Sequence, residues 1–187
     1  MGRFLLKLAA FLVLNLGLQL GILYWMQSRQ QRFQNWEMEA VFLTIPDGRR
    51  YDFVAMGTSH GKTLSRAGNH QRVEKILGKS FFNLSKGNGT GVLPGRLFFE
   101  EFLERGNSAP HLIYFIDAWA MSSPKWNEAS FCLSDEPFSL RRLAKLRRAG
   151  FTTDSLANWY KSKFSVNGWM RMKPNTDYEG KTDLMTN

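Results

Sequence analysis

The chain has 187 residues, 43% hydrophobic and 22% charged, which is typical of one folded domain with an attachment. This composition excludes a disordered chain and a multi-span membrane protein. A single cysteine, Cys132, excludes a disulfide framework and a cysteine-rich zinc site, and the three histidines form no HExxH pattern. We therefore expect no metal and no cofactor. The formal net charge of +9 favours contact with anionic surfaces.

An apolar segment near the N-terminus, from Leu8 to Met26, carries no charged side chain. At about 1.5 Å per residue, a helix of this length crosses the roughly 30 Å hydrocarbon core of a bilayer. Tyr24 and Trp25 stand at its end, where aromatic rings prefer the membrane interface. No small-x-small cleavage site follows, so we expect an uncleaved single-pass anchor rather than a signal peptide.

The charges beside this segment bear on its orientation. Arg3 and Lys7 favour a cytoplasmic N-terminus, although basic residues on the far flank oppose that orientation. The sequence thus predicts a tip and transmembrane anchor over residues 1–35, in the cytoplasmic (inner) membrane. It predicts a folded extracytoplasmic domain over residues 36–187.

Behind the anchor, strand and helix signals alternate, which predicts an α/β fold with a parallel sheet and crossover helices. The expected strands are Tyr51–Met56, Ser80–Leu84 and His111–Ile116, and the expected helices are Arg72–Leu77, Arg96–Glu104 and Ser139–Arg148. The third strand is apolar throughout, which predicts that it is covered on both faces. After residue 150 the pattern decays, and residues 165–187 are predicted to form turns and loops.

The loop after the first strand, Gly57-Thr-Ser-His-Gly-Lys-Thr63, supports two different chemistries, because ligands of parallel sheets bind at the carboxyl ends of strands. Its last three residues match the end of a phosphate-binding loop, GxxxxGK[ST], but Met56 stands where the first glycine belongs. In the other interpretation, Gly57 permits a tight strand-to-helix turn that presents Ser59 as a nucleophile. A serine that only caps the next helix is the structural alternative.

The segment Tyr51-Asp-Phe-Val-Ala-Met-Gly-Thr-Ser-His60 resembles block I of the SGNH (GDSL-like) hydrolases, with Gly-Thr-Ser in place of Gly-Asp-Ser. It is most similar to the membrane-anchored envelope branch, which includes proteins of D-alanyl transfer and alginate O-acetylation. Phe81–Gly87 resembles block II, and Leu112–Ala118 occupies the place of block III. The resemblance covers about residues 50–120. It implies a flavodoxin-like sheet with Ser59 as catalytic nucleophile.

The same resemblance implies the remaining parts of a site. Gly87 and Gly89, in the loop of block II, would donate backbone amides to the oxyanion. Block III normally supplies an asparagine donor, but here Asp117 stands near that place, and an ionised carboxylate only accepts hydrogen bonds. Asn83 and Asn88 are substitutes without positional support.

The family's C-terminal Asp-x-x-His block is absent, since no histidine follows His111. Without that base a serine hydroxyl is a weak nucleophile. His60 adjoins Ser59, but neighbouring side chains diverge on a turn, which disfavours it as the base. We therefore expect a domain that lacks its C-terminal part, truncated or inactive as this chain.

The implied function is a membrane-anchored esterase or acyltransferase that acts on acyl esters of an envelope polysaccharide or lipid. The alternative is a non-catalytic membrane-tethered scaffold or binding protein in envelope biogenesis, followed by a phosphate-loop nucleotide binder. The expected partners are the lipid bilayer and an envelope polysaccharide or acyl donor, with no nucleic acid. Two further features have both a binding and a structural interpretation. They are the basic helix around Ser139–Arg148 and the tryptophans Trp119, Trp126, Trp159 and Trp169.

Overall fold

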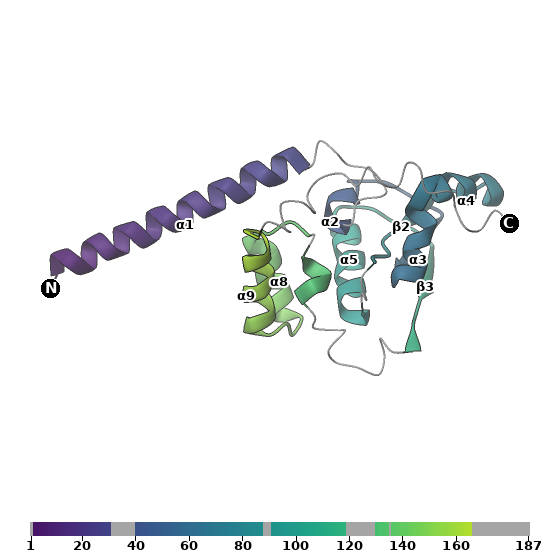
Figure 1. Cartoon of the computed structure of the whole chain (residues 1–187). Coiled ribbons are helices and arrows are strands. Elements are labelled where there is room, and N and C mark those ends of the chain that lie inside the picture. The colour runs from purple at the N-terminus through teal and green to yellow at the C-terminus, as the bar shows by residue number, and fades with distance from the viewer. Residues whose placement is uncertain (1, 31–39, 88–90, 119–129, 135, 166–187) are drawn as a thin grey trace. The chain divides into compact units, whose positions relative to one another are not determined.

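The computed structural model describes residues 2–30, 40–87, 91–118, 130–134 and 136–165 (Figure 1). The chain divides into two compact units, Met1–Phe33 and Gln34–Asn187. The first unit contains one helix, α1 (Gly2–Gln30). Its segment Gly2–Trp25 is long and apolar enough to span a membrane or to act as a signal anchor.

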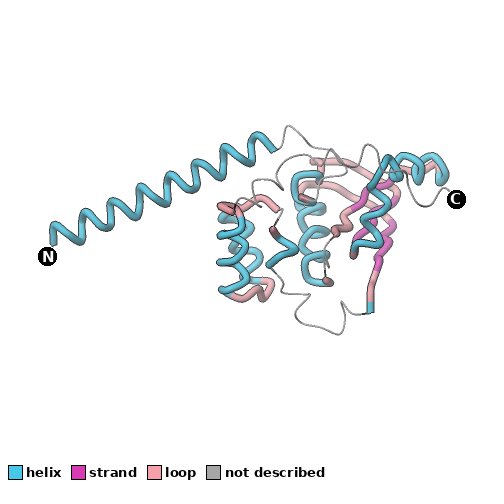
Figure 2. Tube along the Cα trace, viewed as in Figure 1, coloured by secondary structure: helices cyan, strands magenta, loops and turns pink. Residues whose placement is uncertain are grey.

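The second unit is built on a three-stranded parallel sheet, which confirms the predicted α/β class (Figure 2). Its strands are β1 (Phe53–Gly57), β2 (Phe81–Asn83) and β3 (His111–Phe115). They lie in the order β2-β1-β3, so β1 is central and pairs with both of its neighbours. All three strands form where the alternating pattern predicts them, within a residue or two at each end.

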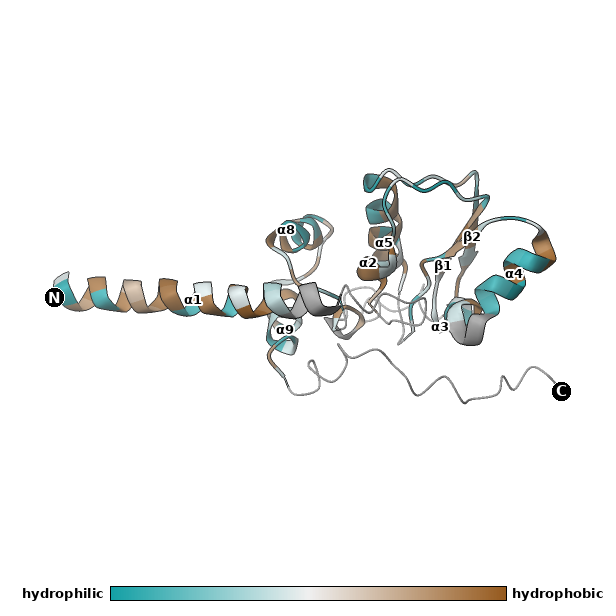
Figure 3. Cartoon of the chain, turned by 90° about the horizontal axis from the view of Figure 1, so that it is seen from above, coloured by the Kyte–Doolittle hydropathy of each residue, from teal (hydrophilic) through white to brown (hydrophobic). Residues whose placement is uncertain are grey.

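Helices cover both faces of this sheet. Between β1 and β2 the chain forms α3 (Ser59–Lys62), the 3₁₀ helix η2 (Thr63–Gly68) and α4 (Asn69–Leu77). Between β2 and β3 it forms α5 (Val92–Glu104), which packs with the short α2 (Val41–Thr44). Figure 3 shows α2 and α5 on one side of the sheet and α3 and α4 on the other. The three layers enclose a core in which strand residues meet the helices: Val41, Phe42, Ile45, Val54, Met56, Phe82, Leu84, Phe98 and Phe102.

The C-terminal part of the described chain contains η3 (Ser130–Leu133), α8 (Leu140–Arg148) and α9 (Thr153–Ser162). The predicted basic helix corresponds to α8, where Ser139 caps the first turn by accepting from the backbone amide of Arg142 at 3.1 Å. Helix α9 was not predicted, although Thr152 caps it in the same way. Its Trp159 is fully buried and packs in the core, which settles the structural role of that tryptophan.

The prediction that β3 is covered on both faces is wrong. Leu112 is 48% exposed and Ile113 37% exposed, and within the described ranges β3 pairs only with β1. An apolar run shows that a strand has apolar side chains, but it does not show whether another element packs over them. An edge strand and a central strand can therefore have the same apolar sequence. The loops predicted over residues 166–187, and Trp119, Trp126 and Trp169, lie outside the described residues.

Candidate functional site

The end of β1 makes a turn that only glycine tolerates. Gly57 has φ +135°, and a Cβ atom at that position would lie 2.2 Å from the carbonyl oxygen of Phe115 in β3. The backbone amide of Thr58 donates to the same carbonyl at 3.4 Å. Ser59 follows as the first residue of α3 and is half-buried. The candidate nucleophile therefore stands at the carboxyl edge of the central strand.

Helix α3 packs tightly against the two neighbouring strand ends. A Cβ atom on Gly61 would lie 2.3 Å from Ser85 Oγ and 2.8 Å from Phe115 Cδ2. The buried Asn83 side chain donates from Nδ2 to the Gly61 carbonyl and to Ser65 Oγ, each at 2.8 Å. An amide group has two N–H donors, and both are used here. Asn83 thus fixes the fold and is not available to an oxyanion.

The loop after β2 is held against the Ser59 turn. The backbone amide of Lys86 donates to the Gly57 carbonyl at 3.2 Å, which places Gly87 beside the end of β1. The Lys86 ammonium pairs with Glu136 Oε1 at 2.8 Å, and both side chains are 0% exposed. Gly89, the second predicted oxyanion donor, lies outside the described residues.

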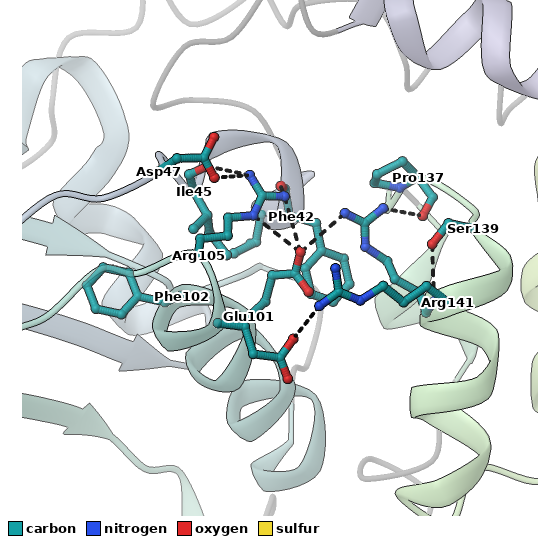
Figure 4. A network of polar contacts seen from close by, with 12 residues as sticks. Phe42, Ile45, Asp47, Glu101, Phe102, Arg105, Pro137, Ser139 and Arg141 are labelled. Carbon is teal, nitrogen blue, oxygen red and sulfur yellow. Dashed lines mark hydrogen bonds and ion pairs between the residues drawn. The ribbon is translucent and has the colours of Figure 1, made fainter.

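Glu136 also joins this loop to α2. Its two carboxylate oxygens accept from the backbone amides of Val41 and Phe42, each at 2.9 Å. At the other end of α2, Arg105 donates to the carbonyls of Phe42 and Ile45 at 2.9 and 2.7 Å (Figure 4). A helix of four residues cannot satisfy its own terminal groups, so these two charged side chains stabilise it from both ends.

Around Arg105 the charges form a network between α5 and α8. Glu101 accepts from Arg105 at 3.2 Å and lies 3.6 Å from the guanidinium of Arg142. The Arg142 guanidinium also lies over the Phe42 ring, 4.7 Å from its centroid. Burial lowers the pKa of Arg142, against the opposing effect of Glu101. The network holds the α8 region to the three-layered core.

Beside Ser59, a side-chain pair joins the ends of β1 and β3. His60 Nδ1 lies 3.0 Å from Asp117 Oδ1, with the two side chains 75% and 18% exposed. Asp117 Oδ2 is buried and has no hydrogen-bond partner among the residues described. The same holds for the buried hydroxyl oxygens of Thr58 and Ser85. The segments after β1 and β3 therefore meet through His60, which the sequence disfavoured as a base.

The geometry of α3 bears on the phosphate-loop hypothesis. Such a loop presents open backbone amides to a phosphate before its helix begins. Here the helix begins at Ser59, so Gly61 and Lys62 lie within it, and the Lys62 side chain is only 3% exposed. This arrangement disfavours a nucleotide cradle. Within the described ranges, no three His, Cys, Asp or Glu side chains are grouped to hold a metal ion.

The chain was compared with protein families, curated proteins and solved structures. No protein-family model, no curated protein and no solved structure matches the chain. A fold class alone does not determine an activity, so the function must be argued from the residues of this site.

Proposed function

We propose that the chain is a membrane-anchored, SGNH-like serine esterase or acyltransferase that acts on acyl esters of an envelope polysaccharide or lipid. The observation that carries the proposal is the position of Ser59, on a glycine-dependent turn at the carboxyl end of the central strand β1. Catalytic and ligand-binding groups of open parallel sheets gather at this edge. The loops that follow β2 and β3 pack beside the same turn.

The strand order supports a flavodoxin-like architecture for the domain. The order β2-β1-β3 agrees with the first three strands of the flavodoxin-like order 2-1-3-4-5. In that order the first strand lies between the second and the third, so the chain crosses over the first strand to form the third. Helices on both faces, as in Figure 3, belong to the same arrangement.

The proposed reaction begins with attack of Ser59 Oγ on the acyl carbon of an ester. The tetrahedral oxyanion is assigned to backbone amides of the Ser59 turn and of the Gly87–Gly89 loop. Collapse of this intermediate breaks the ester C–O bond and leaves an acyl-serine and a free alcohol. Water or an acceptor hydroxyl then takes the acyl group, which gives hydrolysis or transfer.

The apolar helix α1 supports a location at the membrane. We propose that it anchors the chain in the cytoplasmic membrane, with the domain on the extracytoplasmic side. Envelope polysaccharides and lipids carry acyl esters within reach of a tethered domain. The anchor would raise the local concentration of such substrates without any new contact in the site.

Fluorophosphonate labelling of the full chain in mild detergent, read by intact mass, tests the proposal. We expect one adduct, located at Ser59 and absent from Ser59→Ala. Ser108→Ala is the matched control, because Ser108 is exposed and lies next to the amino end of β3. If the folded protein takes no label, Ser59 is not an activated nucleophile. A non-catalytic tethered scaffold is then the favoured function.

A further inference from the structure

We propose that His60, held by Asp117, is the general base of the Ser59 site, in place of the Asp-x-x-His pair that the sequence lacks. The inference rests on the proposed function, because a base is required only if Ser59 attacks an acyl group. It assigns two roles. His60 is a catalytic residue that exchanges a proton at the reacting atoms, and Asp117 is a positioning residue that acts through His60.

The two side chains are in contact. His60 Nδ1 lies 3.0 Å from Asp117 Oδ1. An ionised carboxylate only accepts hydrogen bonds, so the proton of the neutral imidazole stays on Nδ1. Nε2 then carries the free lone pair and is the nitrogen that can accept a proton. The contact therefore selects the tautomer that a base requires.

Asp117 lies in a largely buried environment. Its side chain is 18% exposed, and Oδ2 is buried without a hydrogen-bond partner in the described part of the chain. A carboxylate oxygen that is buried without a donor, as Oδ2 is, is costly, and a positive charge beside the carboxylate offsets that cost. The imidazolium that forms when Nε2 takes a proton supplies this charge. Asp117 thus stabilises His60 most strongly in the protonated state, which is reached during the reaction.

His60 follows Ser59 directly in the chain. Ser59 and His60 are consecutive, so their Cα atoms are about 3.8 Å apart, but their side chains point in different directions. A direct hydrogen bond is not needed, because a base also acts through one bridging water. The His60 side chain is 75% exposed, which gives water access to the imidazole.

The proton balance follows from these roles. As Ser59 Oγ bonds to the acyl carbon, its proton passes through the water to His60 Nε2. The imidazolium then returns a proton to the leaving alkoxide as the ester C–O bond breaks. In the second half, water or an acceptor hydroxyl gives its proton to Nε2 and attacks the acyl-serine. His60 returns a proton to Ser59 Oγ as the bond between the acyl carbon and Oγ breaks, so no proton is gained or lost over the cycle.

The assignment also gives a reason for the aspartate at the block III position. An asparagine there would serve as an oxyanion donor, which a carboxylate cannot do. A carboxylate is the better partner for a histidine that must become positively charged. The residue that departs from the family pattern is therefore the one that the His60 role requires.

The test is the rate at which the full chain in mild detergent reacts with a fluorophosphonate at Ser59. Expected is a fall of about 100-fold or more in His60→Gln, the range of a lost general base. Asp117→Asn should slow labelling by about 10-fold. His111→Gln is the matched control, because this histidine is also exposed but begins β3 at the opposite edge of the sheet. It should label at the wild-type rate.

Two further measurements separate catalysis from a loss of structure. Added imidazole should restore part of the labelling rate of His60→Gly, which it would not do for a misfolded protein. Proton–nitrogen correlation spectra should show the Nδ1–H tautomer of His60 in the wild type and its loss in Asp117→Asn. Circular dichroism confirms that each variant is folded.

The outcomes distinguish this inference from the proposed function. If wild type labels at Ser59 and folded His60→Gln labels equally fast, the base assignment is overturned and the proposed function stands. If His60→Gln is slow but Asp117→Asn changes neither rate nor tautomer, the positioning role of Asp117 is overturned. If wild type itself takes no label, both fail.

Discussion

Removing Lys86 alone is expected to destabilise the protein more than removing both charges of the buried Lys86–Glu136 pair. The two groups are 2.8 Å apart, and both side chains are 0% exposed. Glu136 also accepts from the amides of Val41 and Phe42. Lys86→Met therefore leaves a buried carboxylate with part of its compensation missing, while Glu136→Gln leaves a buried ammonium.

The expected magnitudes follow from that burial. Loss of one partner of a buried ion pair costs about 3–5 kcal/mol, because the remaining charge loses its counter-charge. In Lys86→Met/Glu136→Gln no charge is left, and the glutamine oxygen still accepts from one amide of α2. The double variant should lose about 1–3 kcal/mol, the cost of one unsatisfied buried amide. The costs of the two single variants, added together, should therefore exceed the cost of the double variant by at least about 3 kcal/mol.

Urea unfolding of the full chain in mild detergent, followed by tryptophan fluorescence, measures these free energies. Trp159 is fully buried and donates to the Glu136 carbonyl at 3.3 Å, so its emission reports on this region. Arg96→Met is the matched control, because Arg96 pairs with Glu100 on the exposed surface of α5 at 2.7 Å. It should cost under about 0.5 kcal/mol.

Two results would refute the reasoning. One is a cost below about 1 kcal/mol for Lys86→Met, which would mean that water or another group compensates the carboxylate. The other is additivity of the two single costs to within about 0.5 kcal/mol, which is the behaviour of independent sites. Either would show that the pair does not hold the Gly87 loop in place.

Four further outcomes are expected. Gly57→Ala should lower the free energy of unfolding in urea by more than about 3 kcal/mol, because the strain of φ +135° adds to the 2.2 Å approach to the Phe115 carbonyl oxygen. Gly78→Ala should lower it by about 1–2 kcal/mol, because Gly78 has φ +60° but open space around it. Hydrogen bonds from Ser80 hold the pKa of Asp52 below its usual range. The ionised Asp52 carboxylate therefore stabilises the folded state above about pH 4, and this stabilisation is lost as the pH falls through the pKa of Asp52 in the folded protein. Asp52→Asn should show a smaller loss of stability on acidification, measured as urea midpoints. Arg105→Met should cost roughly 1.5–3 kcal/mol in the same assay through the carbonyls of α2, and Arg105→Lys should recover only part. The intact chain should resist carbonate extraction from membranes, and deleting residues 2–25 should release it.

The elements that could be predicted are those whose own residues carry the signal. The strands β1 and β2 are short apolar runs between turn residues, and α8 has a leucine stripe, a serine cap and a following glycine. Helix α5 begins earlier than expected because Pro94 lies in its first turn, where a missing N–H costs nothing. Such features depend on local sequence alone.

The elements that could not be predicted depend on distant partners. Helix α2 has four residues and forms because Glu136 and Arg105 bind its ends from far along the chain. Helix α9 buries only Leu156 and Trp159, too few positions to produce a clear 3.6-residue period. The exposure of β3 depends on which elements lie beside it, and the residues of the strand do not indicate those neighbours.

The same distinction explains what the sequence revealed of the site. Ser59 and Asp117 stand out through motif positions, but their proximity depends on strand order. Gly57 pairs with Phe115 in the β1–β3 register, so Ser59 and Asp117 each follow the last paired residue by the same short interval. The strand between them in sequence, β2, lies on the other side of β1. Reading along the chain therefore separates two residues that the sheet brings to one edge.

This proximity changes how the departures from the SGNH pattern are to be weighed. Taken singly, Asp117 cannot donate to an oxyanion, and His60 is disfavoured as a base because neighbouring side chains diverge. In the structure they form one contact, His60 Nδ1 to Asp117 Oδ1 at 3.0 Å. Without His60, the Asp117 carboxylate would be desolvated with no partner, which destabilises the fold. Without Asp117, His60 would have no fixed tautomer. Each residue supplies what the other lacks, so the proposed base assignment accounts for both residues through one contact.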